Sequence, residues 1–135
     1  MESESLATAP SERLLKRVIR LDIAFEFAIG LALLAAFRPV AGWLNVRESF
    51  ILAGGAVFVV TGALIWSLTR GPIVERRVRA LALANIAGGF AGWLVLVATW
   101  PRFEGEGRWL LGFVADSTIL LGVAELLLLR RRDSA

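Results

Sequence analysis

Five polar residues that could do chemistry lie inside otherwise apolar stretches of this chain. They are Asp22, Glu26, Asn85, Asp116 and Glu125. Inserting an ionisable side chain at the centre of a membrane helix costs on the order of 3 kcal/mol. Each acid is therefore expected either to have a stabilising partner or to be kept for a function. The five residues therefore predict an intramembrane polar cluster that binds a proton, a small cation or a ligand.

Asp22 and Glu26 are four residues apart, which places both on one face of a helix. Two ionised acids at that spacing repel each other strongly where the dielectric constant is low. Either one of them is protonated, or a cation lies between them. That cation could be Arg20, an arginine from another helix, a bound metal ion or a proton.

Asp116 and Glu125 are nine residues apart, which places them on opposite faces of their helix. Both cannot point into one bundle core, so one must face another subunit or reach the membrane interface. Glu125 is near a helix end, so we expect it to reach the headgroups, to pair with Arg79 or Arg20, or to act functionally. Asp116 lies near mid-membrane and is the acid that we expect to be functional.

The residue types that are missing narrow the chemistry. The chain has no Cys, His or Tyr, so it has no thiolate nucleophile, disulfide, iron–sulfur cluster or histidine ligand. We expect no cofactor, and the identity of any metal is left open. Catalysis would depend on carboxylates, Asn, Ser, Thr or Arg.

The elements that must position these residues are four membrane helices. The chain has 135 residues, of which 57% are hydrophobic, and a mean hydropathy of +0.69. Each apolar stretch supplies the roughly 20 residues that cross a bilayer core. We expect helices at about 14–37, 46–68, 78–100 and 108–129.

Local signals mark the ends of these helices. The first ends at Arg38-Pro39, and Asn45-x-x-Glu48 forms a capping-box pattern before the second, which stops at Gly71-Pro72. Short loops predict an antiparallel up–down bundle. The fold class is therefore an all-α polytopic membrane protein with one four-helix domain, 13–132. A flexible polar N-terminal tail, 1–12, and a short C-terminal tail, 133–135, flank it.

The basic residues, 14 of 15 of them arginines, predict the orientation of this bundle. Eleven gather on one side: Arg13, Lys16, Arg17, Arg20, Arg70, Arg76, Arg77, Arg79, Arg130, Arg131 and Arg132. The other side has four: Arg38, Arg47, Arg102 and Arg108. Cytoplasmic loops carry the basic excess, so both termini are expected in the cytoplasm. This placement also argues against nucleic acid as a partner.

Small residues predict where helices approach closely. Ala24, Ala28 and Ala32 form a small-residue stripe on the first helix, opposite its acids. Gly88 and Gly92 form a GxxxG motif on the third. We expect both to pack against other helices, with the GxxxG motif acting within the chain.

Several segments resemble a group of small, uncharacterised four-helix integral membrane proteins of bacteria. They are "LALAN", "GFVADSTILLGVAELLLLRRR", "RLDIAFEFAIGLALL" and "RPVAGWLN". A weaker likeness, in layout alone, links the chain to DoxX-like membrane proteins. The resemblance implies a four-helix fold in the bacterial inner (cytoplasmic) membrane and no particular activity. Ile86 stands where the pattern has Trp and Asp116 where it has an amide, so a shared function need not involve Asp116.

Three function classes remain. The first is a proton- or small-cation-linked transport or channel-like protein that uses the intramembrane carboxylates and is expected to form a homo-oligomer in the lipid bilayer. The second is an accessory or structural membrane protein that binds lipid or a larger complex, with the acids in salt bridges. A membrane enzyme has the least support, because His and Cys are missing and the outer loops are short.

Overall fold

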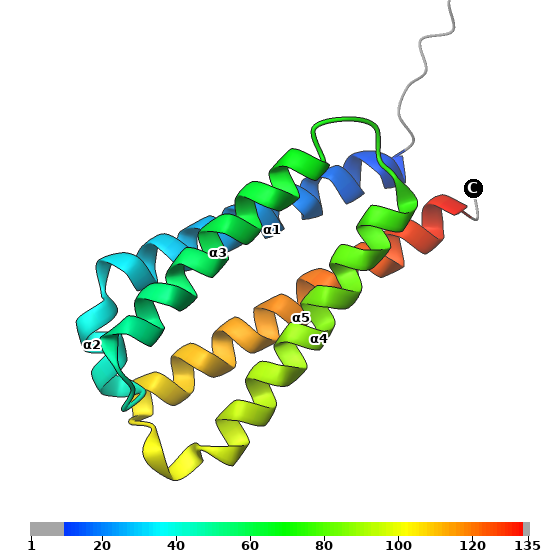
Figure 1. Ribbon diagram of the computed structural model, residues 1–135. Helices are drawn as coiled ribbons and strands as arrows, with labels where there is room; N and C mark the ends of the chain where they lie inside the picture. The colour runs from blue at the N-terminus through cyan, green and yellow to red at the C-terminus, as the bar shows by residue number, and fades with distance from the viewer. Residues whose placement is uncertain (1–9, 134–135) are drawn as a thin grey trace, which may run out of the picture.

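The computed structural model describes residues 10–133, with side chains to residue 131, and these residues form an all-α fold (Figure 1). The five α-helices are α1 (Pro10–Ala35), α2 (Phe37–Trp43), α3 (Glu48–Leu68), α4 (Glu75–Ala98) and α5 (Gly105–Asp133). A 3₁₀ turn, Trp100–Arg102, precedes α5. The predicted all-α class is confirmed. The expected tails lie largely outside the described residues, and their inner residues, Pro10–Glu12 and Asp133, are helical.

Three of the helices, α3, α4 and α5, are long and apolar enough to cross a membrane. Helix α1 has the length, with 26 residues, but any 18 consecutive residues within it include Arg20, Asp22 and Glu26. Helix α5 also carries two acids in its apolar stretch, so it is the third charge, Arg20, that separates α1 from the other long helices. Length and composition support a membrane protein with three such helices.

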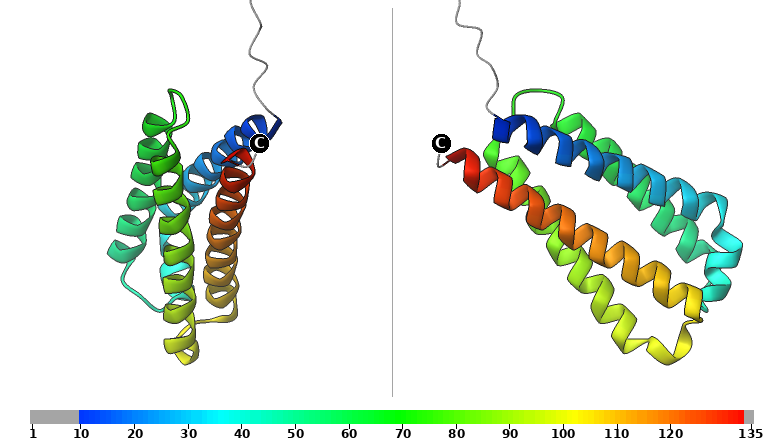
Figure 2. Two further views of the ribbon diagram at one scale, coloured as in Figure 1. Left: turned by 90° about the vertical axis from the view of Figure 1, so that its right-hand side faces the viewer. Right: turned by 180° about the vertical axis from the view of Figure 1, so that it is seen from behind.

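The long helices pack as two pairs, α1 with α3 and α4 with α5, and contact between α1 and α5 joins the pairs (Figures 1 and 2). Although α3 and α4 are consecutive, they make scarcely any contact with each other. The expectation that all sequential helices are packed neighbours is therefore wrong for this pair. Loop 69–74 bridges them, at the end of the bundle where α1 begins and α5 ends (Figure 2).

Glycines permit the close contacts within each pair. A Cβ atom on Gly30 of α1 would lie 2.9 Å from the carbonyl oxygen of Gly55 on α3. A Cβ atom on Gly122 of α5 would lie 2.5 Å from the carbonyl oxygen of Ala82 on α4. No side chain fits at such distances, so these positions set the helix separation.

The predicted small-residue motifs contribute less to packing than expected. Ala24, Ala28 and Ala32 are exposed and make no close-packing face within this chain. In the GxxxG motif, a Cβ atom on Gly92 would lie 3.2 Å from that of Ala115 on α5, but one on Gly88 would meet nothing within 4 Å.

The turn region between α1 and α3 also differs from the prediction. Arg38-Pro39 does not end the helical structure, because α2 begins at Phe37 after a break at Ala36 (φ −110°, ψ 28°). Proline fits the first turn of a helix, where backbone N–H groups have no intrahelical acceptor. Asn45 adopts φ 49° beyond α2, and Arg47, without a side-chain hydrogen bond, is the N-cap of α3. The predicted capping box is therefore wrong.

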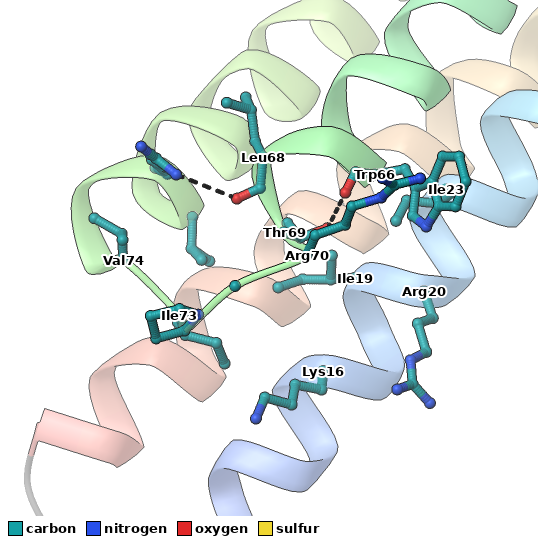
Figure 3. A pocket seen from close by; sticks show the side chains of 14 residues that line it. Lys16, Ile19, Arg20, Ile23, Trp66, Leu68, Thr69, Arg70, Ile73 and Val74 are labelled. Atoms are coloured by element: carbon teal, nitrogen blue, oxygen red, sulfur yellow. Dashed lines mark hydrogen bonds between the residues drawn. The ribbon is translucent and has the colours of Figure 1, made fainter.

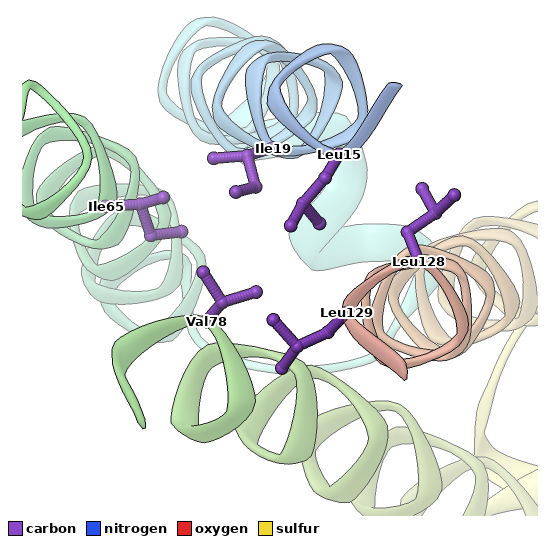
Figure 4. Close-up of a cluster of buried hydrophobic side chains, with 6 residues drawn as sticks. All are labelled: Leu15, Ile19, Ile65, Val78, Leu128 and Leu129. Carbon is purple, nitrogen blue, oxygen red and sulfur yellow. The ribbon is translucent and has the colours of Figure 1, made fainter. Parts of the chain in front are cut away.

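Two apolar clusters occupy opposite ends of the bundle. Six side chains from all four long helices form the terminal cluster, at the end of the bundle where α1 begins and α5 ends (Figure 4). They are Leu15, Ile19, Ile65, Val78, Leu128 and Leu129. The distal cluster consists of Val40, Ala41 and Ile51. The interior between the two clusters holds the polar residues.

Candidate functional site

The structure brings four of the five expected polar residues together in the bundle interior. Asp22 and Glu26 come from α1, Asn85 from α4 and Glu125 from α5. Their exposed fractions are 0%, 5%, 5% and 0% in that order. Asn85 donates a hydrogen bond from Nδ2 to Oδ2 of Asp22 at 2.9 Å. We call these four residues the polar cluster.

Helical periodicity explains why these side chains point inward. The buried residues of α1 are Leu15, Ile19, Asp22, Glu26 and Gly30, at spacings of three or four residues. That spacing defines one face of a helix, and the acids occupy positions where an apolar side chain would normally pack. Helix α1 must therefore bury its acids in order to bury its apolar residues.

Three oxygen atoms of the polar cluster lack hydrogen-bond partners. Both carboxyl oxygens of Glu125, and Oδ1 of Asp22, are buried and accept no hydrogen bond from any residue in 10–133. A buried polar group left in this state costs about 1–3 kcal/mol. The site therefore contains capacity to hold protons or to bind a ligand that supplies positive charge.

The arginines expected as partners lie elsewhere. Arg79 pairs with Glu75, one turn earlier on α4, and both side chains are on the exposed surface. Arg20 is exposed and lines a separate cavity. Within the described part of the chain, neither arginine forms an ion pair with a buried acid, and Glu125 stays in the interior instead of reaching the headgroups.

Asp116 lies on the opposite face of α5 from Glu125, as the nine-residue spacing predicts, and its side chain is exposed. The indole nitrogen of Trp93 on α4 donates a hydrogen bond to Asp116 Oδ1 at 2.8 Å. The structure thus separates Asp116, the acid expected to be functional, from the polar cluster. No sequence signal could have paired it with Trp93, 23 residues away on another helix.

A cavity of about 370 Å³ reaches the polar cluster between α3 and α4. Glu26 and Asn85 form part of its lining, with the hydroxyl groups of Thr61 and Thr118 and otherwise apolar walls. Cavities of this size, mostly apolar with a few convergent polar groups, are typical of ligand sites. The Thr118 hydroxyl donates a hydrogen bond to the Val114 carbonyl at 2.7 Å.

The polar cluster contains three carboxyl groups, those of Asp22, Glu26 and Glu125, each of which can hold a proton. Among residues 10–133, no three acidic side chains lie close enough together to coordinate a metal ion. Glu26 lines the cavity, whereas Asp22 and Glu125 are fully buried behind it. An incoming cation would therefore meet Glu26 first.

Comparison with known proteins gives no further guide to the site. No family model, curated protein or solved structure matches this chain. The resemblance to small bacterial four-helix membrane proteins therefore stays a prediction from the sequence. The function has to be argued from the geometry.

Proposed function

We propose that this chain is an integral membrane protein whose polar cluster binds and passes a proton or a small cation. In this proposal α1, α3, α4 and α5 all cross the bilayer of the bacterial inner membrane, with both termini in the cytoplasm. The arginine asymmetry supports the orientation, since the arginine-rich segments surround both termini and loop 69–74.

Glu125 is the observation that carries the proposal. Its side chain is completely buried, and neither carboxyl oxygen has a hydrogen-bond partner among residues 10–133. An apolar residue would pack there without that cost, because buried ionic groups can often be replaced by apolar ones with no loss of stability. Acids kept inside membrane helices typically mark ion or proton pathways.

The surface of α1 supports a fourth membrane helix. Its acids point inward, and its outward face carries Leu21 and Leu31, which are 63% and 58% exposed, together with the exposed alanine stripe. Lipid would therefore meet a largely apolar surface, while the two acids of α1 stay inside the protein.

The cavity supports entry to the cluster from the side of the bundle. Glu26 is reached between α3 and α4, whereas the terminal cluster blocks the direct line toward the chain ends. Passage across the membrane then requires the terminal cluster to loosen. Asp22 and Glu26 follow Ile19 of the terminal cluster on the same face of α1. Protonation of these acids, or cation binding to them, would then favour the state in which the terminal cluster is loosened.

The exposed face with Asp116 and Trp93 supports assembly of more than one copy. A carboxylate on a lipid-facing surface is costly, and Trp93 supplies only one hydrogen bond to it. A second copy of this chain would shield the pair, so the proposed assembly is a homo-oligomer.

The test is ion flux in proteoliposomes under an imposed pH or cation gradient. Glu26→Gln and Glu125→Gln should abolish flux while leaving the protein folded, because each removes one titratable group from the polar cluster. Asp116→Asn is the matched control on α5 and should retain flux. Native protein no leakier than empty liposomes, or full flux in Glu125→Gln, would overturn the proposal.

A further inference from the structure

A second cavity, of about 540 Å³, lies at the end of the bundle where α1 begins and α5 ends (Figure 3). It is formed by the first half of α1, the end of α3, loop 69–74 and the start of α4. Four basic side chains line it: Lys16, Arg20, Arg70 and Arg77. No acidic side chain of residues 10–133 forms part of the lining. We call this cavity the basic pocket.

The contacts of these basic groups hold them in place and neutralise little of their charge. The Arg70 guanidinium lies 4.0 Å from the centroid of the Trp66 ring, and Arg77 donates a hydrogen bond to the Leu68 carbonyl at 3.4 Å. Among the described residues, Lys16 alone of the four has an acidic partner, Glu12, at 2.9 Å. The pocket therefore keeps a positive potential, and its guanidinium groups suit anions with several oxygens.

Apart from Thr69, the other side chains of the wall are apolar. Ile19, Ile23 and Val78 come from the helices, Ile73 and Val74 from the loop, and Trp66 closes one side (Figure 3). Free phosphate or sulfate would use none of this surface. A ligand that combines an anionic head with an apolar chain would use both parts.

The position of the pocket along the bundle agrees with such a ligand. Helix α3, which can cross a membrane, ends at Leu68, and α4 begins at Glu75. The basic pocket thus lies where the apolar part of two such helices meets the interface, at the level of lipid headgroups. Basic pockets between membrane helices on the cytoplasmic side bind anionic headgroups. In the proposed orientation, the basic pocket lies on that side.

We propose that the basic pocket binds the phosphate headgroup of an anionic phospholipid. Arg70, Arg77 and Arg20 contact the phosphate oxygens, and the first acyl carbons pack against Ile23 and Trp66. The inference does not depend on ion transport, since it uses no residue of the polar cluster.

The test uses the full chain in phosphatidylcholine vesicles that contain a minor fraction of acyl-brominated phosphatidylglycerol. Bromine quenches nearby tryptophan fluorescence, and subtraction of the Trp66→Phe signal isolates Trp66 from the other four tryptophans. Brominated phosphatidylcholine at the same fraction measures non-selective contact. We expect phosphatidylglycerol to quench Trp66 more strongly.

Arg77→Gln should lower the preference for phosphatidylglycerol about fivefold, the equivalent of about 1 kcal/mol per basic residue near an anionic surface. Arg76→Gln is the matched control, because Arg76 is exposed on the same turn of α4 and does not line the pocket. Arg70→Gln, on the loop, should give a similar loss and serves if Arg77→Gln fails to fold.

Equal quenching by both brominated lipids would overturn the proposal, as would equal losses in Arg77→Gln and Arg76→Gln. A third arm adds millimolar inorganic phosphate to the native protein. Lipid binding that is unaffected supports a phospholipid site, whereas complete displacement of the lipid would overturn it and assign the pocket to a free phosphate.

Discussion

Replacing Glu125 by methionine tests whether the polar cluster is kept at the expense of stability. Methionine is unbranched and similar in length to glutamate, and it adapts to irregular cores. The change removes a fully buried carboxyl group whose two oxygens make no hydrogen bond within residues 10–133. It adds no new polar atom that needs a partner.

The magnitude follows from two opposing effects. Removing the unsatisfied carboxyl group recovers about 1–3 kcal/mol. An imperfect fit of the new side chain costs less than about 1.5 kcal/mol. We therefore expect Glu125→Met to raise the free energy of unfolding by about 1–2 kcal/mol and to abolish ion flux.

The assay is reversible denaturant unfolding of the purified protein in detergent, with flux measured on the same preparations. Leu129→Met is the matched control, one turn further along α5 and 2% exposed, and should leave stability nearly unchanged or slightly lower. If Glu125→Met lost more than about 2 kcal/mol, its carboxyl group would have a strong stabilising partner. That result would refute the reasoning.

Three further predictions concern packing, the buried hydrogen bond and topology. Gly122→Ala should destabilise the protein by about 1–3 kcal/mol in denaturant unfolding, because its Cβ atom would lie 2.5 Å from a carbonyl oxygen of α4. Gly88→Ala, with nothing within 4 Å, is the control and should be neutral or slightly stabilising. Asn85→Ala should cost about 1–3 kcal/mol in the same assay, because the buried carboxylate of α1 loses the hydrogen bond at 2.9 Å. The chain has no cysteine, so Gly71→Cys and Gly105→Cys provide single labelling sites, and an impermeant maleimide should reach them from opposite sides of the membrane.

Each of these results could go against the structure. Equal stability of the two glycine variants would mean that α4 and α5 are further apart than described. An unchanged free energy of unfolding in Asn85→Ala would remove the hydrogen bond from the stability of the interior. Labelling of both cysteines from one side would contradict the four-helix topology.

The positions of the helices could be predicted from the sequence because their signals are local. Apolar runs of sufficient length, ended by Gly71-Pro72 and Pro101, located three of the long helices to within a few residues. Arg38-Pro39 was wrongly interpreted as the end of the helical structure. A proline disfavours continuation of a helix but is accepted in the first turn of a new one, here α2.

Sequence spacing also determined which polar side chains share a face and which oppose each other. Asp22 and Glu26 had to point the same way, and Asp116 and Glu125 had to point apart, because helical periodicity alone sets these relations. Spacing within one helix carries no information about which face meets a neighbouring helix. The choice of Glu125 over Asp116 for the interior is therefore a result of packing.

Only the tertiary structure decided how the helices meet. The glycines at 30, 55 and 122 permit close pairing of α1 with α3 and of α4 with α5, while α3 and α4 are left apart with a cavity that reaches Glu26. Contacts such as Asn85 with Asp22, 63 residues apart, depend on the relative rotation of helices about their axes. That rotation is set by the sum of many weak contacts between distant segments, so no local pattern in the chain records it.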